Sequence, residues 1–322
     1  MRPGRHLRWA SLGAAILSAA FFSLPRAAHA CSVCGCDPSS GTLGLDRPTQ
    51  GDLRFALEDR YLQKESGTMD SGTRESERED RLDLRLQYSP PLPRLSLQLE
   101  VPIYAWKTHL GLDGTADDTT RGLSDVVLTA RYEVLKLGGL VPRHVIALTG
   151  SLKAPTGSNT HLAAVDNGQP DEHKQIGTGT WDELIGAWYT YGDFPTVAYA
   201  GLTARVNGTN SRGNHFGNAL FGTVGLRRSF LESKALYFAL DAQARNAGLD
   251  TVPVTTGNLL TGRTYDPNSG GLVTYAVGTA GYALTQELLL RATLQVVVYT
   301  ALNGTQGEHP VAFVGVAYDL TL

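Results

Sequence analysis

The chain has 322 residues, a formal net charge of −3 at pH 7 and three cysteines. This length suffices for one large all-β domain, and the near-neutral charge excludes the basic surface of a nucleic-acid-binding protein, so no nucleic acid is expected as a partner. After residue 30, no apolar run reaches the roughly 20 residues that a membrane-spanning helix needs.

Residues 1–30 have the features of a secretory signal peptide. Three arginines within the first eight residues supply a positive start, residues 9–24 form an apolar core, and Ala28-His29-Ala30 provides the small residues of a cleavage site. A membrane-anchoring helix is the alternative interpretation. We therefore predict that the chain is exported and that its mature fold begins at Cys31.

Residues 31–51 are predicted to form an irregular tail, because they are rich in Gly, Ser and Pro and have no periodicity. All three cysteines lie here, in the C-x-x-C-x-C pattern of Cys31, Cys34 and Cys36. Closely spaced thiolates favour soft metals, so Cu(I) or Zn(II) is a candidate cofactor, and a periplasmic metal or thiol protein is a candidate partner. A Cys31–Cys34 disulfide and lipid attachment at Cys31 are the alternatives.

From residue 52 onward, apolar and polar side chains alternate with a period of two, which predicts β-strands because successive side chains leave opposite faces of a strand. Most predicted strands are near the length of about 9–11 residues that a tilted membrane strand needs. The twelve predicted strands span residues 52–62, 81–89, 95–105, 125–135, 144–154, 181–191, 197–207, 218–230, 235–246, 272–284, 287–299 and 311–322.

The connections between these strands alternate in length. They are long and polar after the odd-numbered strands, as at residues 64–80, and short after the even-numbered ones, as at residues 90–94. Membrane barrels have short periplasmic turns and long external loops, whereas a soluble β-sandwich has no reason to keep this alternation. We therefore predict that residues 52–322 form a single antiparallel up-and-down transmembrane β-barrel, with both ends periplasmic. The charged run at residues 65–81 is expected to be an external loop.

One face of most predicted strands is apolar and is assigned to lipid, and the other carries charge and is assigned to the barrel lumen. These charges either line a narrow water-filled channel or pair with one another and fill the lumen, as in smaller barrels. The predicted lumen-lining residues are Glu58, Arg60, Asp83, Arg85, Glu100, Arg131, Glu133, Lys153, Arg205, Arg227, Asp241, Arg245 and Arg291.

The apolar faces contain three further signals. Pro102 cannot donate a hydrogen bond to a neighbouring strand, so a bulge or an early strand end is expected there. Asp59 is a charged residue on an otherwise apolar face. Ten aromatic residues near strand ends are expected to form the two interfacial girdles of a membrane barrel. They are Tyr61, Tyr88, Tyr104, Trp106, Tyr132, Trp181, Tyr189, Phe230, Tyr299 and Tyr318.

No hydrolase elbow, nucleotide-binding glycine pattern or haem-attachment site occurs, so the chain is not expected to be an enzyme. Several histidines are expected in external loops, where solvated side chains are the ordinary interpretation and a bound cation is the alternative. These are His109, His161, His173, His215 and His309.

Three internal stretches and the last predicted strand resemble known barrels. The stretches are Gly122-Leu-Ser-Asp125, Lys153-Ala-Pro-Thr-Gly157 and Gly177-Thr-Gly-Thr-Trp-Asp182, and the final strand ends on an aromatic-x-apolar-x-apolar pattern at Tyr318, Leu320 and Leu322. The chain resembles the outer-membrane β-barrel family that is associated with the meta-cleavage pathway of phenol degradation. Ser124 stands where that family usually has a second glycine, and the cysteine tail is not a general feature of the family.

This resemblance implies an outer-membrane location and a passive channel or transporter for small solutes, including aromatic or poorly soluble ones. The expected partners are then outer-membrane lipid, the barrel-assembly machinery and a small-molecule solute. Two other functions stay open. One is a metal-handling or redox-linked barrel that uses the cysteine tail, and the other is a structural sheath for a periplasmic or electron-transfer partner.

Overall fold

The computed structural model describes residues 50–67, 74–111, 117–138, 142–162, 172–230, 235–256, 259–304 and 306–321. The predicted signal peptide and the three cysteines lie outside these ranges. The cleavage of the signal peptide and the role of the cysteines therefore stay predictions.

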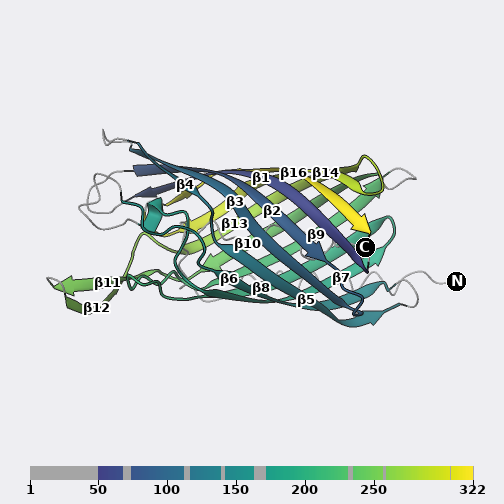
Figure 1. Ribbon diagram of the computed structural model, residues 1–322, viewed down its shortest axis with the longest axis horizontal. Helices are drawn as coiled ribbons and strands as arrows, with labels where there is room; N and C mark the ends of the chain where they lie inside the picture. The colour runs from purple at the N-terminus through teal and green to yellow at the C-terminus, as the bar shows by residue number, and fades with distance from the viewer. Residues whose placement is uncertain are drawn as a thin grey trace, which may run out of the picture.

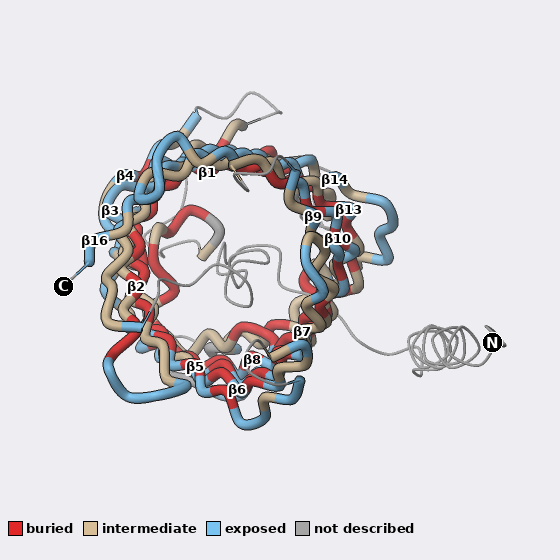
Figure 2. Tube along the Cα trace, turned by 90° about the vertical axis from the view of Figure 1, so that its right-hand side faces the viewer, coloured by how far each residue is buried: buried red, intermediate tan, exposed pale blue. Residues whose placement is uncertain are grey.

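Twelve long strands form one closed antiparallel barrel, as the alternation of side chains predicts (Figures 1 and 2). Each strand pairs with the strands before and after it, and the first also pairs with the last, so the sheet has no open edge around its circumference. The barrel strands are β1 (Asp52–Gly67), β2 (Arg74–Tyr88), β3 (Leu95–Gly111), β5 (Val126–Leu137), β6 (His144–Ala154), β7 (Asp182–Asp193), β8 (Thr196–Asn207), β9 (Ala219–Phe230), β10 (Leu236–Ala247), β13 (Gly271–Ala283), β14 (Leu288–Leu302) and β16 (Val311–Thr321).

The predicted final strand closes the barrel. β16 runs antiparallel to β1, with Asp52 opposite Thr321 and Tyr61 opposite Ala312. At this seam the Arg54 guanidinium contacts the Asp319 carboxylate at 2.5 Å. Closure pairs the backbone N–H and C=O groups of both terminal strands, which is the condition for stability in lipid.

The two ends of the barrel differ in their connections. At one end, here called the short-turn end, adjacent strands are joined by short segments such as residues 194–195 and 284–287. Both ends of the described chain also lie there, because Asp52 pairs with Thr321. The opposite, long-loop end has the remaining elements (Figure 1), namely β4 (Asp118–Gly122), the 3-10 helix η1 (Glu172–Lys174), the hairpin β11 (Thr251–Thr256) with β12 (Leu259–Tyr265), and β15 (Gly307–Glu308).

The expectation of an external loop at residues 65–81 is wrong for most of the run. β1 continues to Gly67 and β2 begins at Arg74, and Glu77 and Glu79 are buried on the inner face of β2. The pattern concealed the strand because its outer face is also polar there, with exposed Arg78 and Asp80. The expectation of a loop at His109 is also wrong. His109 is buried in β3, opposite Glu77 of β2.

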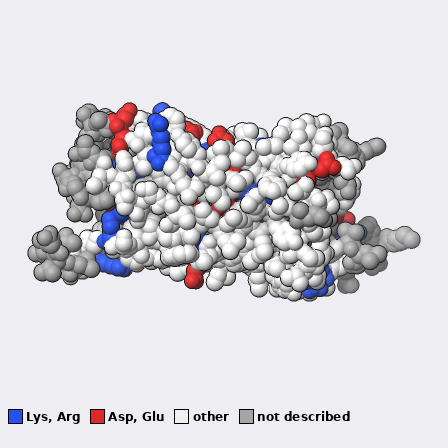
Figure 3. Space-filling model, in the orientation of Figure 1, with Lys and Arg blue, Asp and Glu red and all other residues white. Residues whose placement is uncertain are grey.

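The face of the barrel in Figure 3 has few charged side chains between its ends, and many large hydrophobic side chains are exposed. Side chains such as Leu240 and Ile185 are 72% and 68% exposed, whereas their neighbours Asp241 and Leu184 are buried. Nine of the ten aromatic residues assigned to the girdles are exposed, and Tyr88 is half-buried. This distribution is that of a barrel whose outer face contacts lipid.

Two irregularities in the strand patterns have structural counterparts. The register between β2 and β3 shifts between Leu82 and Asp83, next to Pro102, so the expected bulge is present and the strand continues beyond it. Asp59 is exposed on the outer face of β1, between Leu82 and Val314 on the adjacent strands. No helix within the described ranges is long and apolar enough to cross a membrane.

Candidate channel lumen

The thirteen side chains assigned to the lumen all lie on the inner side of their strands. Eleven of them are buried, and the other two, Arg227 and Arg291, are half-buried. Figure 2 shows that buried and exposed positions both occur around the ring of strands. The charges are therefore enclosed by the barrel, and their arrangement decides whether they fill it or line it.

A network of ion pairs covers the wall formed by β1, β2 and β3. The Arg85 guanidinium lies between two carboxylates, at 2.9 Å from Glu58 on β1 and 3.0 Å from Glu100 on β3. Arg60 on β1 contacts Glu79 on β2 at 2.7 Å. Each of these pairs joins neighbouring strands, so the charges are compensated along the wall and not across the lumen.

Other inner ion pairs are lateral in the same way. Arg81 contacts Asp83 on its own strand at 2.7 Å, and Arg131 contacts Glu133 on β5 at 3.0 Å. The contact from Arg291 on β14 to Glu58 on β1 passes over one strand, β16. Buried charges of this kind need partners because burial penalises an isolated charge strongly. For the pairs named so far the partners lie beside them on the wall, whereas the buried Arg245 of β10 reaches over β13 and β14 to Glu308 of β15.

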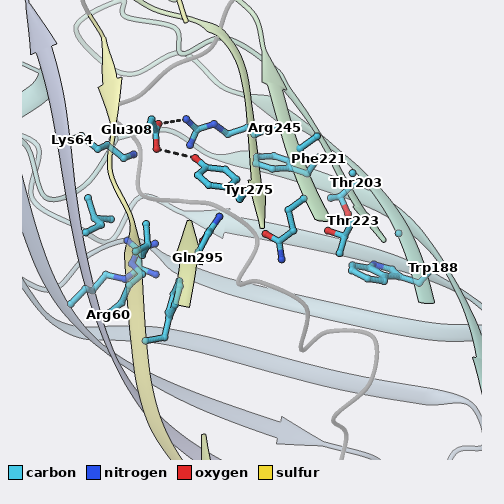
Figure 4. A pocket seen from close by; sticks show the side chains of 18 of the residues that line it. Arg60, Lys64, Trp188, Thr203, Phe221, Thr223, Arg245, Tyr275, Gln295 and Glu308 are labelled. Carbon is cyan, nitrogen blue, oxygen red and sulfur yellow. Dashed lines mark hydrogen bonds and ion pairs between the residues drawn. The ribbon is translucent and has the colours of Figure 1, made fainter. Parts of the chain in front are cut away.

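A cavity lies inside the barrel, and the space free of protein atoms there is about 870 Å³ when the open solvent connected with it is included. Arg60 and Lys64 of β1 lie on one side of it, and Trp188 of β7 lies on the opposite side (Figure 4). Arg245 reaches Glu308 of the long-loop end, which also accepts a hydrogen bond from the Tyr275 hydroxyl at 2.9 Å. The remaining lining residues are Leu62, Arg81, Arg85, Gly201, Thr203, Phe221, Gly222, Thr223, Gln243, Ala244, Gln295, Val311 and Phe313.

A second cavity is lined by Glu58, Arg85 and Arg291, with Arg54 and Gln87. The two cavities together account for five of the thirteen residues that the sequence assigned to the lumen, Glu58, Arg60, Arg85, Arg245 and Arg291. The other eight lie on the inner face but line neither of these cavities. They are Asp83, Glu100, Arg131, Glu133, Lys153, Arg205, Arg227 and Asp241.

Aromatic rings cover inward-facing glycines on the wall opposite the ion-pair network. At each of these glycines an added Cβ would come within 2.7 Å of ring atoms from the directly paired residue of the neighbouring strand. Each ring therefore occupies the space that a side chain at the paired glycine would need. The ring thus lies against the inner wall. The pairs are Trp188 with Gly201, Tyr199 with Gly225, and Tyr237 with Gly281.

Sequence reasoning missed this aromatic wall. On β7 the inner Leu184 and Trp188 alternate with the outer Ile185 and Tyr189, so both faces are apolar and the period of two does not separate lumen from lipid. A glycine directly paired with the aromatic residue on the next strand could have indicated an inward-facing ring. This pairing is known only once the register of the two strands is known.

Lys153 lies in a fully buried cluster at the long-loop end of the barrel. Its ammonium group is 2.5 Å from Asp182 and 3.2 Å from Asp125. Asp125 also accepts hydrogen bonds from the backbone N–H groups of Gly157 and Thr178, at 3.0 and 2.9 Å. These residues belong to the three stretches that resemble known barrels. The stretches therefore meet in space and fix the connection between β6 and β7.

No group of three or more His, Cys, Asp or Glu side chains within the described ranges is arranged to hold a metal ion. His161 is 2.8 Å from Asp118, and His309 is 3.1 Å from Glu65, both at the long-loop end. The proposed Cu(I) or Zn(II) ligands Cys31, Cys34 and Cys36 lie outside the described residues.

No family model matches this chain, and no curated protein matches it in sequence. The solved structure of the COG4313 outer membrane channel from Pseudomonas putida F1 is similar, with a TM-score of 0.62 and 15% identity, over 88% of this chain and 99% of that chain. Weaker likenesses include the TodX monoaromatic hydrocarbon channel (deltaS2S3 mutant), with a TM-score of 0.46, 13% identity and coverage of 85% and 91% of the two chains. The translocator domain of the autotransporter NalP from Neisseria meningitidis has a TM-score of 0.45, 13% identity and coverage of 85% and 90%. The chain therefore has the fold of an outer-membrane β-barrel.

Proposed function

We propose that the chain is a passive channel for small solutes in the bacterial outer membrane. The observation that carries this proposal is that Arg60 and Arg85 pair with carboxylates of neighbouring strands along the wall, while a cavity lies between Arg60 and Lys64 on one side and Trp188 on the other. A lumen filled by its own charges would instead have pairs that cross it, as in small barrels of about eight strands. A polar wall around open space holds water, which a diffusing solute requires.

Three further points support this proposal. The similar Pseudomonas putida protein is named as an outer membrane channel. The three stretches that resemble the phenol-degradation-associated family meet in one buried cluster, so membership of that family is part of the proposal. The apolar outer surface suits outer-membrane lipid as the surrounding partner, with insertion by the barrel-assembly machinery.

Single-channel recording tests this function. Protein folded in detergent and added to a planar lipid bilayer is expected to give discrete current steps in potassium chloride, because ions follow the same water-filled path as solutes. Heat-unfolded protein from the same preparation is the control and should give none. Folded protein that inserts but conducts no more than bare lipid would refute a channel.

The direction of insertion is a separate prediction. A protease site inserted after Gly262, in the hairpin of β11 and β12 at the long-loop end, is expected to be cleaved on intact cells. The same site inserted after Leu92, in the exposed short turn between β2 and β3, is expected to be cleaved only after the outer membrane is opened. The opposite pattern would contradict the orientation in which short turns face the periplasm.

A further inference from the structure

The charged side chains around the larger cavity are mostly cationic. They are Arg60, Lys64, Arg81, Arg85 and Arg245, with Glu308 as the acidic member of the lining. Glu308 is bound to Arg245 and Tyr275, so its charge is compensated within the lining. The carboxylates that pair with Arg60 and Arg85, such as Glu79 and Glu58, lie on the wall and do not line this cavity. Among the described residues, the lining of this cavity therefore has more cationic than acidic side chains.

The opposite side of the cavity is aromatic, and the lining includes two buried hydrogen-bond donors that have no partner among the described residues. Trp188 and Phe221 lie across the space from Arg60 and Lys64 (Figure 4). Trp188 is 7% exposed, and its indole N–H has no hydrogen-bond partner in the described part of the chain. The side-chain amide nitrogen of Gln243, which also lines the cavity, has none either. Unpartnered buried donors are uncommon, and an acceptor group on a ligand satisfies them.

From this geometry we infer that the channel selects small organic anions that combine one carboxylate with a flat apolar body, such as aromatic carboxylates. The carboxylate accepts hydrogen bonds and pairs with guanidinium groups, and the flat body packs on the rings of Trp188 and Phe221. This inference rests on the proposed channel function and names its substrate class.

The test combines ion selectivity with current block in planar bilayers. In a potassium chloride gradient the reversal potential is expected to show a preference for chloride over potassium. Addition of benzoate at millimolar concentration is expected to interrupt the current, because benzoate dwells in the cavity. Acetate lacks the flat body, benzyl alcohol lacks the charge and benzylammonium has the opposite charge, so each is expected to interrupt it much less. Comparison of cyclohexanecarboxylate with benzoate shows whether the current block requires an aromatic ring or only an apolar group of similar size.

Two substitutions assign the effect to the cavity. Trp188→Leu is expected to weaken the benzoate block by about five- to tenfold while chloride preference stays, since an aromatic contact is removed and the cations remain. Lys64→Gln is expected to reduce chloride preference. Tyr237→Leu is the matched control, because Tyr237 also covers a glycine on the inner wall but does not line this cavity. The shift in gel mobility on heating shows that each variant is folded.

The outcomes separate this inference from the proposed function. Absence of conductance from folded wild-type protein overturns the channel and the inference together. A conducting channel that prefers potassium, or that is blocked equally by acetate and benzoate, overturns only the inference. If Trp188→Leu and Tyr237→Leu weaken the benzoate block equally, the benzoate site does not lie in this cavity.

Discussion

Replacement of Lys153 by methionine is expected to lower the free energy of unfolding of the barrel by about 3–5 kcal/mol, which is typical of breaking a buried ion pair. The Lys153 side chain is 1% exposed, and it neutralises both Asp125 and Asp182. Methionine has a similar length but no charge, so two carboxylates stay buried without their cation. Urea unfolding of protein folded into lipid vesicles, followed by tryptophan fluorescence, measures the change.

The Lys136→Met substitution is the matched control. Lys136 contacts Glu133, but its side chain is 29% exposed at the short-turn end, where water already screens the pair. Its removal is expected to cost less than about 1 kcal/mol. The triple variant Lys153→Met, Asp125→Asn, Asp182→Asn is expected to recover part of the lost stability because it removes the uncompensated charge. A Lys153→Met protein as stable as the Lys136→Met protein would show that the cluster contributes little.

Substitution of Gly201 by alanine is expected to reduce single-channel conductance several-fold. An added Cβ would lie 2.5 Å from the Trp188 ring, which is closer than real Cβ contacts allow. Gly201 and Trp188 are directly paired on the inner wall, so the ring has to move away from β8 and into the cavity that it lines. The measurement is the current step in planar bilayers.

Two further variants test the cause of this effect. Gly278→Ala adds the same methyl group to a barrel strand where no atom lies within 4 Å, and its conductance is expected to match the wild type. The double variant Gly201→Ala, Trp188→Leu is expected to regain conductance, because the smaller side chain removes the clash. An unchanged current in Gly201→Ala, or no recovery in the double variant, would mean that the Trp188 ring does not limit the channel.

The sequence predicted the barrel well because its outer and inner faces differ chemically over most strands. The strand number, the closing role of β16 and the alternation of most connections follow from period-two patterns and from the polarity of the links. The prediction failed where β1 and β2 extend beyond the apolar band. There Glu77, Arg78, Glu79 and Asp80 are all charged, so both faces look alike and alternation carries no information.

The site was predictable only in part, for a related reason. A charged residue on an otherwise apolar strand is predicted to face inward, and Arg60, Arg85 and Arg245 are among the residues around the larger cavity. Phe221 and Trp188 resemble lipid-facing residues in sequence, and their position depends on register. The partners of Lys153 could not be predicted either, because Asp125 and Asp182 become its neighbours only when three separate stretches meet.

The seam between β1 and β16 has a consequence for the biogenesis of this protein. Arg54 and Asp319, which form an ion pair there, are separated by 265 positions in the sequence, so the barrel cannot close before β16 has arrived. Until then both β1 and β14 have unpaired backbone groups, which are templates for aggregation. The proposed outer-membrane location implies that the chain crosses the periplasm while these edges are still unpaired. Loss of β16 by proteolysis would leave two open edges, on β1 and β14, in place of one seam.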